Sequence, residues 1–305
     1  VVDAVQRQVP LRVLVCAPTY NALDNVFLEA VATITRIVQH QDVECVRIRS
    51  SYRPVDANVP LALDLELNRA SPSLPLQRLR RRLQNRVGIT VIGATTEQTH
   101  NLLVVGNDSA RQEFFDFIIL DEASQVDVGQ AILPFAALAS DGVVVVAGDP
   151  KQLPPIHKAK APVGLEAMVG SVYSFFEAVH HVTPAVLQEN YRSSSAIVQL
   201  AHEAGYERSL TSYSPDLRIN IVSPIPTAPP PGWPQGLFWT PEWATMLEPD
   251  SPLCCFVYPE GRSSQWNPFE ADAVAALAYL MYGRLGAQLL NERDRAAGRG
   301  DAEGG

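Results

Sequence analysis

Short runs of apolar residues alternate along the chain with segments whose apolar positions recur at helical spacing. Consecutive apolar residues predict strands buried on both faces at residues 11–17 (LRVLVCA), 89–94 (ITVIGA), 114–120 (FFDFIIL) and 143–148 (VVVVAG). Helical spacing predicts helices at residues 22–39 and 128–138. Strands of this kind belong to parallel sheets that helices cover on both faces. The pattern therefore predicts an α/β fold whose chemistry gathers where the strands end.

The alternation of predicted strands and helices is interrupted in two regions of the chain. Residues 46–88 are rich in Pro, Leu and Arg and end in LQRLRRRLQNR, which predicts an inserted helical subdomain within a first domain of residues 1–183. Its arginines are either a solvated helix face or a contact for phosphates. A second domain is predicted over residues 184–290, with strands at 184–187 and 253–258 and a helix at 269–290. Residues 291–305 predict a disordered tail or linker.

Composition and charge narrow the function classes. The 305 residues are 47% hydrophobic and 19% charged, which is typical of a globular chain of two domains. Neither a membrane span nor a signal segment is recognisable, so we expect a cytoplasmic protein, or a nuclear one in a eukaryote. The net charge of −9 argues against nucleic-acid binding by bulk charge. It is compatible with a single strand that is bound locally, by backbone amides, hydroxyls and a few basic or aromatic groups.

Polar side chains follow two of the predicted strands. Asp121 and Glu122 come directly after FFDFIIL, and Asp149 and Gln152 follow VVVV in the segment GDPKQLPP. A carboxylate at a strand end can hold Mg²⁺ beside a nucleotide, and an adjacent Glu can act as the general base. An amide at the same edge can bind a phosphate or the attacking water. Either pair by itself is also typical of solvated loops.

Taken together, five segments resemble the superfamily 1 helicases, in the branch that includes the nonsense-mediated-decay helicase. In chain order they are similar to motif Ia (APTYNALDN, 17–25), motif Ic (ATTEQT, 94–99), the Walker B motif II (DEASQ, 121–125), motif III (GDPKQLPP, 148–155) and motif IV (LQENYRSS, 187–194). The resemblance implies a RecA-like P-loop NTPase sheet in the first domain and a partial second RecA-like domain.

The resemblance also implies a role for each matching residue. It implies Mg²⁺ at Asp121, general base catalysis by Glu122, contacts near the γ-phosphate from Gln125, Gln152 and the Asp149 loop, and an arginine finger at Arg192. Tyr191 would stack on the base of ATP, or else be a core tyrosine. The track for single-stranded nucleic acid would be lined by Pro18, Thr19, Asn21, Thr95 and Thr96. Capping of a helix is the alternative role for Thr19 and Asn21.

One expected element is missing from the sequence. No G-x-x-x-x-G-K-[ST] phosphate loop occurs in the 305 residues, nor do the later helicase motifs. We expect a chain that begins just after the loop and lacks N-terminal and C-terminal parts of its parent, so that by itself it hydrolyses ATP poorly. The predicted function is an ATP-dependent helicase or translocase on single-stranded DNA or RNA. The alternatives are a catalytically degenerate binding scaffold and, less consistent with GDPKQLPP and NYRS, a P-loop ATPase of another class.

Overall fold

The computed structural model describes residues 1–38, 43–68, 72–103, 113–156, 161–217, 221–250, 253–258 and 267–282. The chain forms two compact units, Val1–Pro184 and Ala185–Gly305. Each unit is described by itself. The first unit contains α1 (Val2–Arg7), β1 (Leu11–Ala17), α2 (Tyr20–Ile37), β2 (Val43–Ser50), β3 (Asp64–Leu67), α3 (Leu74–Gln84), β4 (Ile89–Thr95), α4 (Thr96–Leu103), β5 (Phe115–Leu120), the short 3-10 helix η1 (Ala123–Gln125), α5 (Val128–Phe135), β6 (Leu138–Val146), α6 (Glu166–Val169) and α7 (Val172–His180).

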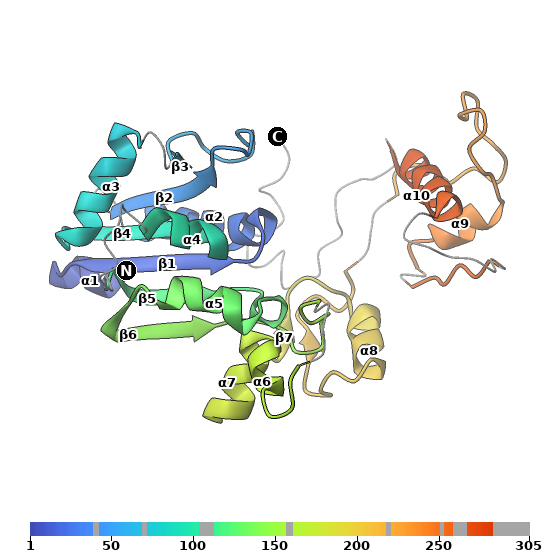
Figure 1. The fold of residues 1–305 in the computed structure, drawn as a ribbon. Helices are drawn as coiled ribbons and strands as arrows, with labels where there is room; N and C mark the ends of the chain where they lie inside the picture. Colours follow the sequence, from blue (N-terminus) through green and yellow to red (C-terminus); the bar gives the residue numbers. More distant parts are fainter. Residues whose placement is uncertain are drawn as a thin grey trace. The chain divides into compact units, whose positions relative to one another are not determined.

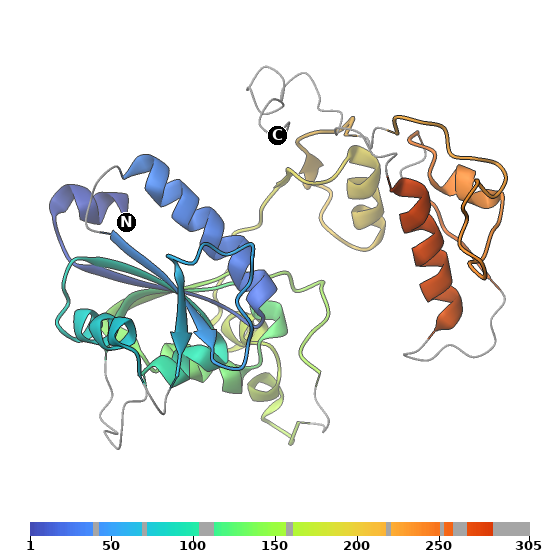
Figure 2. The same cartoon turned by 90° about the horizontal axis from the view of Figure 1, so that it is seen from above.

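The first unit is built on one sheet of six parallel strands in the order β3-β2-β4-β1-β5-β6 (Figure 1). In its centre, β1 is buried over almost its whole length between β4 and β5. Helices cover both faces, α2 on one and α3, α4 and α5 on the other (Figure 2). The predicted α/β fold is confirmed, and it is consistent with a RecA-like domain.

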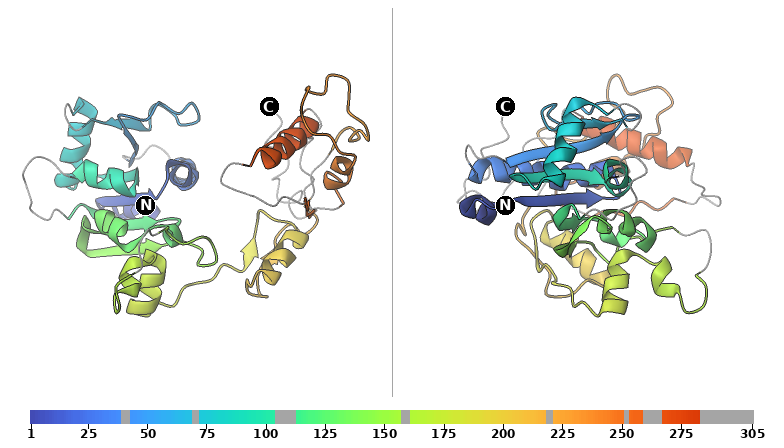
Figure 3. Two further views of the ribbon diagram at one scale, coloured as in Figure 1. Left: turned by 45° about the vertical axis from the view of Figure 1, so that its right-hand side comes forward. Right: turned by 60° about the vertical axis from the view of Figure 1, so that its left-hand side comes forward.

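Two apolar layers attach the helices to the sheet. Leu23 and Phe27 of α2 pack with Val13, Val15 and Val91 on one face. The other face carries the larger core, which includes leucines of α3 and α4 and the inward side chains of β5. The same arrangement of layers can be followed in Figure 3. Because all strands run in one direction, the loops that follow them meet at a single edge of the sheet.

Residues 46–88 do not form the inserted helical subdomain that the sequence predicts. They contain most of β2, the whole of β3 and the helix α3, and both strands belong to the main sheet. Leu76, Leu79 and Leu83 of α3 are buried against that sheet. The prediction failed because β2 and β3 carry charged side chains that pair with one another inside the fold. Neither strand therefore appears in the sequence as an apolar run.

Three of the clustered arginines have partners within the protein. Arg80 donates to the carbonyl of Leu102, Arg82 donates to Thr90 Oγ1 at 3.0 Å, and Arg86 pairs with Asp116 at 2.6 Å. These bonds join α3 and the residues just after it to α4, β4 and β5, which favours a structural role for the three arginines over a phosphate contact.

At the other side of the sheet, β6 begins earlier than predicted. The helix expected to reach residue 138 ends at Phe135, and β6 starts at Leu138 and shifts its register against β5 between Phe115 and Phe117. Among the described residues no strand pairs with the outer side of β6, and its Val143 and Val145 are exposed.

The second unit is organised around aromatic side chains. Its elements are β7 (Glu189–Asn190), α8 (Ser195–Glu203), β8 (Thr211–Ser212), α9 (Glu242–Met246) and α10 (Pro268–Met281). Trp243 is fully buried in a cluster with Ala276 and Leu280 of α10. Strands were predicted at residues 184–187 and 253–258, but within the described chain neither segment joins a sheet, and the parallel pair β7–β8 is two residues long. Residues 291–305, the predicted tail, lie outside the described residues.

Candidate nucleotide and strand site

The segment Asp121–Gln125 is held at the carboxyl edge of the sheet by backbone hydrogen bonds to two neighbouring strands. The N–H of Asp121 donates to the carbonyl of Cys16 in β1 at 2.8 Å. The N–H of Ala123 donates to the carbonyl of Ala147, just after β6, at 2.9 Å. Both carboxylates therefore lie where β5 ends, between the loops that follow β1 and β6.

Asp121 lies in surroundings that disfavour its charge. Partial burial raises the pKa of its carboxyl group above the ordinary value, and a hydrogen bond from the backbone of Glu122 offsets this only in part. No positively charged side chain among the described residues lowers the pKa of Asp121. A bound metal ion would stabilise the charged form, so the surroundings of Asp121 fit a cation ligand.

Glu122 has an unusual backbone conformation. Its φ of 52° and ψ of 35° place it in the left-handed region, where residues other than glycine are uncommon. The carboxylate accepts a hydrogen bond from Gln125 Nε2 at 2.8 Å. The same amide nitrogen lies 3.3 Å from Gln152 Oε1, so side chains from both predicted segments converge at this edge.

The loop Gly148–Gln152 approaches η1 closely. Asp149 accepts a hydrogen bond from the N–H of Lys151 at 2.9 Å, and its carbonyl accepts one from the N–H of Gln152 at 3.1 Å, which gives a tight turn. A Cβ atom at Gly148 would lie 2.8 Å from the nitrogen of Ser124 and 3.2 Å from that of Ala123. The absence of a side chain at Gly148 therefore lets this turn bring Gln152 to the carboxylates.

Replacing Gly148 by alanine is expected to lower the free energy of unfolding of the first unit by about 1–3 kcal/mol, because the new methyl group meets backbone atoms that cannot rotate away. Urea unfolding followed by circular dichroism measures the change. Gly170→Ala is the matched control, since its Cβ would have no neighbour closer than 3.8 Å. Equal stability of the two variants would contradict the close approach described above.

The polar groups at this edge suit Mg²⁺ and a nucleotide. Asp121, Glu122 and Asp149 offer carboxylate oxygens, and Gln125 and Gln152 offer amides, all five exposed or half-buried. Hard oxygen ligands are those that Mg²⁺ prefers, and it commonly binds one or two carboxylates together with phosphate oxygens and water. Within the described ranges no group of three or more His, Cys, Asp or Glu side chains could enclose a metal ion.

The loop between β1 and α2 presents the residues predicted for motif Ia. Thr19 and Asn21 are exposed and Pro18 is half-buried. The hydroxyl of Thr19 accepts a hydrogen bond from the N–H of Ala22 at 3.3 Å, so Thr19 caps α2. The capping alternative thus holds for Thr19. The side chain nevertheless remains open to solvent.

Thr95 and Thr96 are placed differently from the motif Ia residues. Both are buried, at the junction between β4 and α4. Thr95 Oγ1 accepts from the N–H of Gln98 at 3.4 Å, and its carbonyl accepts from Thr99 Oγ1 at 3.1 Å. This burial favours a role in holding the junction together over a direct contact with a strand.

Tyr191 and Arg192 belong to the second unit. Tyr191 is 61% exposed, donates to Glu189 Oε2 at 2.7 Å and has its ring centroid 4.5 Å from that of Tyr213. Arg192 is exposed, and its backbone N–H donates to Asn190 Oδ1 at 2.8 Å. The alternative of a core tyrosine is wrong, since the ring of Tyr191 lies at the surface of its unit.

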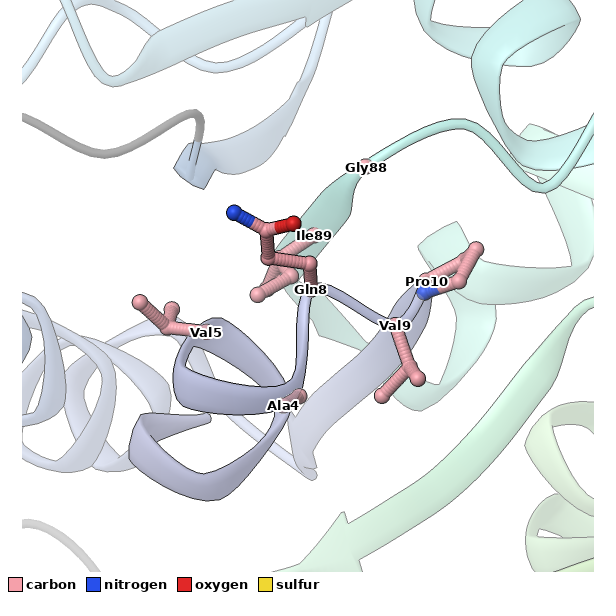
Figure 4. A pocket seen from close by; sticks show the side chains of 7 residues that line it. All are labelled: Ala4, Val5, Gln8, Val9, Pro10, Gly88 and Ile89. Carbon is pink, nitrogen blue, oxygen red and sulfur yellow. The ribbon is translucent and has the colours of Figure 1, made fainter.

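A shallow pocket lies at the amino ends of β1 and β4 (Figure 4). Its walls are mostly aliphatic, and its one side-chain amide belongs to Gln8. In a parallel sheet the amino ends are opposite the carboxyl edge, so this pocket is separate from the cluster at Asp121 and lacks charged groups for a nucleotide.

Two features of the site were not predicted. The hydroxyl of Ser124 is buried and has no hydrogen-bond partner among the described residues, directly beside the carboxylates. Tyr20, the first residue of α2, accepts a hydrogen bond from the N–H of Ser50 at 2.9 Å and so ties the end of β2 to the motif Ia loop. The position of Tyr20 within APTYNALDN was the available signal, but its partner in β2 was not recognised as a strand.

Comparisons with known proteins agree with this picture at a coarse level. No family model matches the chain. It is 31% identical over 114 residues (37% of this chain, 6% of the relative) to the mouse (Mus musculus) 5'-3' DNA helicase ZGRF1. It is 26% identical over 220 residues (65% and 17%) to the mouse RNA helicase Mov10l1. It is 33% identical over 99 residues (32% and 5%) to a human (Homo sapiens) probable helicase with zinc finger domain.

The matched segments are a small part of these relatives. The chain spans between 5% and 17% of the length of the three curated relatives. All three are named helicases. A separate observation is that the described part of the chain contains no helix long and apolar enough to cross a membrane. The similarities, together with the six-stranded parallel sheet, support a relationship of this chain to the helicases.

Proposed function

We propose that the chain is part of the motor core of an ATP-dependent helicase or translocase that moves on single-stranded DNA or RNA, in the cytoplasm or the nucleus. The observation that supports this most is the convergence of Glu122, Gln125 and Gln152 beside the half-buried Asp121. A binding scaffold has no chemical need for this set of side chains at one sheet edge.

In this proposal each group has a defined task. Asp121 helps to hold Mg²⁺, which neutralises charge on the terminal phosphates of ATP. Glu122 accepts the proton of the attacking water, and Gln125 and Gln152 orient that water or the γ-phosphate. Arg192 compensates charge on the transferring phosphoryl group, and Tyr191, exposed in its unit, stacks on the base. The exposed Thr19 and Asn21 contact the phosphates of the strand.

ATP hydrolysis by the protein that carries this chain is expected to rise severalfold or more when single-stranded nucleic acid is added, because strand and nucleotide binding are coupled. Phosphate release measured with and without oligothymidylate or oligouridylate checks this. Strand binding without hydrolysis would favour the degenerate scaffold instead. Hydrolysis that double-stranded DNA alone stimulates would contradict a single-strand motor.

A further inference from the structure

The turn after β2 carries an exposed aromatic residue close to the start of α2. Tyr52 is 98% exposed, two residues beyond Ser50, which ends β2. Its N–H donates to Ser50 Oγ at 3.3 Å, and the N–H of Ser50 donates to the hydroxyl of Tyr20 at 2.9 Å. Since Tyr20 lies between Thr19 and Asn21, these bonds attach the turn to the motif Ia loop.

Arg53 follows Tyr52 directly and carries a positive charge. Its guanidinium carbon lies 4.3 Å from the centroid of the Tyr20 ring, a cation–π distance. Its carbonyl accepts a hydrogen bond from Arg49 Nη1, which fixes the backbone of the turn. Among the residues that the structure describes, no carboxylate forms an ion pair with Arg53, whereas Arg47 and Arg49 are both paired. The side chain of Arg53 is half-buried, with its guanidinium over the ring of Tyr20.

Buried ion pairs hold β2, the strand that leads into this turn, against α2 and β3. Arg47 is fully buried and bonds both Asp24 of α2 and Asp64 of β3 at 2.8 Å or less. Its guanidinium also lies 4.9 Å from the Tyr20 ring. Tyr52 and Arg53 thus follow shortly after a strand that these bonds fix in place, so a ligand would not have to order that strand.

We propose that Tyr52 stacks on an unpaired base and that Arg53 binds an adjoining phosphate, extending the strand surface from the motif Ia loop onto the turn after β2. This inference rests on the proposed function. Stacking on an aromatic ring accepts any base, and the amino end of α2 also favours a phosphate at this point. A local aromatic and cationic pair of this kind is what a chain of net charge −9 needs to hold a strand.

The test measures binding of the full 305-residue chain to fluorescein-labelled oligothymidylate and oligouridylate by fluorescence anisotropy. Tyr52→Ala is expected to weaken binding about tenfold, and Tyr52→Phe to preserve it, because stacking needs the ring and not the hydroxyl. Arg53→Ala is expected to reduce the slope of log affinity against log salt by about 0.7, the value for one phosphate contact on a single strand.

Tyr282→Ala is the matched control, since that residue is 86% exposed in the second unit. It should bind like the wild type, and both Tyr52→Ala and Tyr282→Ala should keep the wild-type melting temperature. Wild-type affinity in Tyr52→Ala would overturn this inference and leave the proposed function standing. Equal losses of affinity in Tyr52→Ala and Tyr52→Phe would do the same. Failure of the wild-type chain to bind either oligonucleotide would overturn both.

Discussion

Replacing Glu122 by glutamine is expected to reduce ATP turnover by about 10²–10⁴-fold in the protein that carries this chain, while ATP still binds. Glutamine has nearly the shape of glutamate and can still accept the 2.8 Å hydrogen bond from Gln125. It cannot accept a proton from the attacking water. The loss should therefore fall on the chemical step rather than on assembly of the site.

Single-turnover hydrolysis and fluorescent-nucleotide binding, measured side by side, separate these two effects. Glu166→Gln provides the control, because Glu166 is exposed and lies outside all five predicted motifs. Undiminished turnover in Glu122→Gln would remove the proposed general base. Loss of nucleotide binding in that variant would show instead that Glu122 acts mainly in holding the ligand.

Replacing Asp116 by alanine is expected to lower the free energy of unfolding by about 3–5 kcal/mol, because it leaves a buried guanidinium without its counter-ion. Arg12 of β1 is 2% exposed and pairs with Asp116 of β5 at 2.8 Å. The backbone N–H of Arg12 also donates to Asp116 at 2.8 Å, and Arg86 reaches it at 2.6 Å. One carboxylate therefore satisfies donors from two separate segments.

The pH dependence of this contribution follows from the pKa of Asp116. Burial alone would raise it, but the hydrogen bonds and charges of Arg12, with the charge of Arg86, lower it below its ordinary value. A carboxyl group with a lowered pKa stabilises the fold above its unfolded-state pKa. That stability is lost as the pH falls through the folded-state pKa, below about 3.9.

Urea unfolding of wild type and Asp116→Ala at neutral pH and at about pH 3 tests both statements. The difference between the proteins should be large at neutral pH and shrink in acid. Asp3→Ala serves as the control, because its ion pair with Arg7 is 71% exposed on both sides and such pairs contribute little. A change below about 1 kcal/mol for Asp116→Ala would contradict the described network.

The central strands could be predicted from sequence because burial on both faces leaves mostly apolar runs, which Arg12 interrupts once in β1 and Asp116 once in β5. β1 was predicted at its observed bounds, and β4 and β5 to within one residue. Strands β2 and β3 were missed for the opposite reason. Arg47 and Arg49 of β2 are paired with Asp64 and Glu66 of β3, and a single sequence does not show that such charges will neutralise one another.

The second unit was harder to predict because its apolar segments are not strands. Residues 253–258 (LCCFVY) have strand-like composition, yet Phe256 packs into the aromatic cluster around Trp243 instead of joining a sheet. Residues 184–187 also read as apolar, but Leu187 is 85% exposed in its unit. Composition alone does not tell a strand from an extended segment that lacks a neighbour.

The parallel order of the strands was enough to predict that the side chains of the candidate site lie close together. Parallel strands send their loops to one edge, so Asp121, Glu122 and Gln152 were expected together, and the hydrogen bonds through Gln125 now join two of them. Sequence could not indicate the burial of Thr96, because that depends on how α4 turns away from β4. Nor could it reveal the left-handed backbone of Glu122.

The left-handed backbone of residue 122 favours glycine for stability, whereas the proposed chemistry requires a carboxylate there. Glycine would adopt the conformation of residue 122 without steric penalty, and other residues do so at about 1–3 kcal/mol. A search for thermostable variants of this chain would therefore favour glycine at position 122, and the variants it selected would lack the carboxylate that we propose as the general base. Gains in heat resistance at this residue are thus a poor guide to a better enzyme.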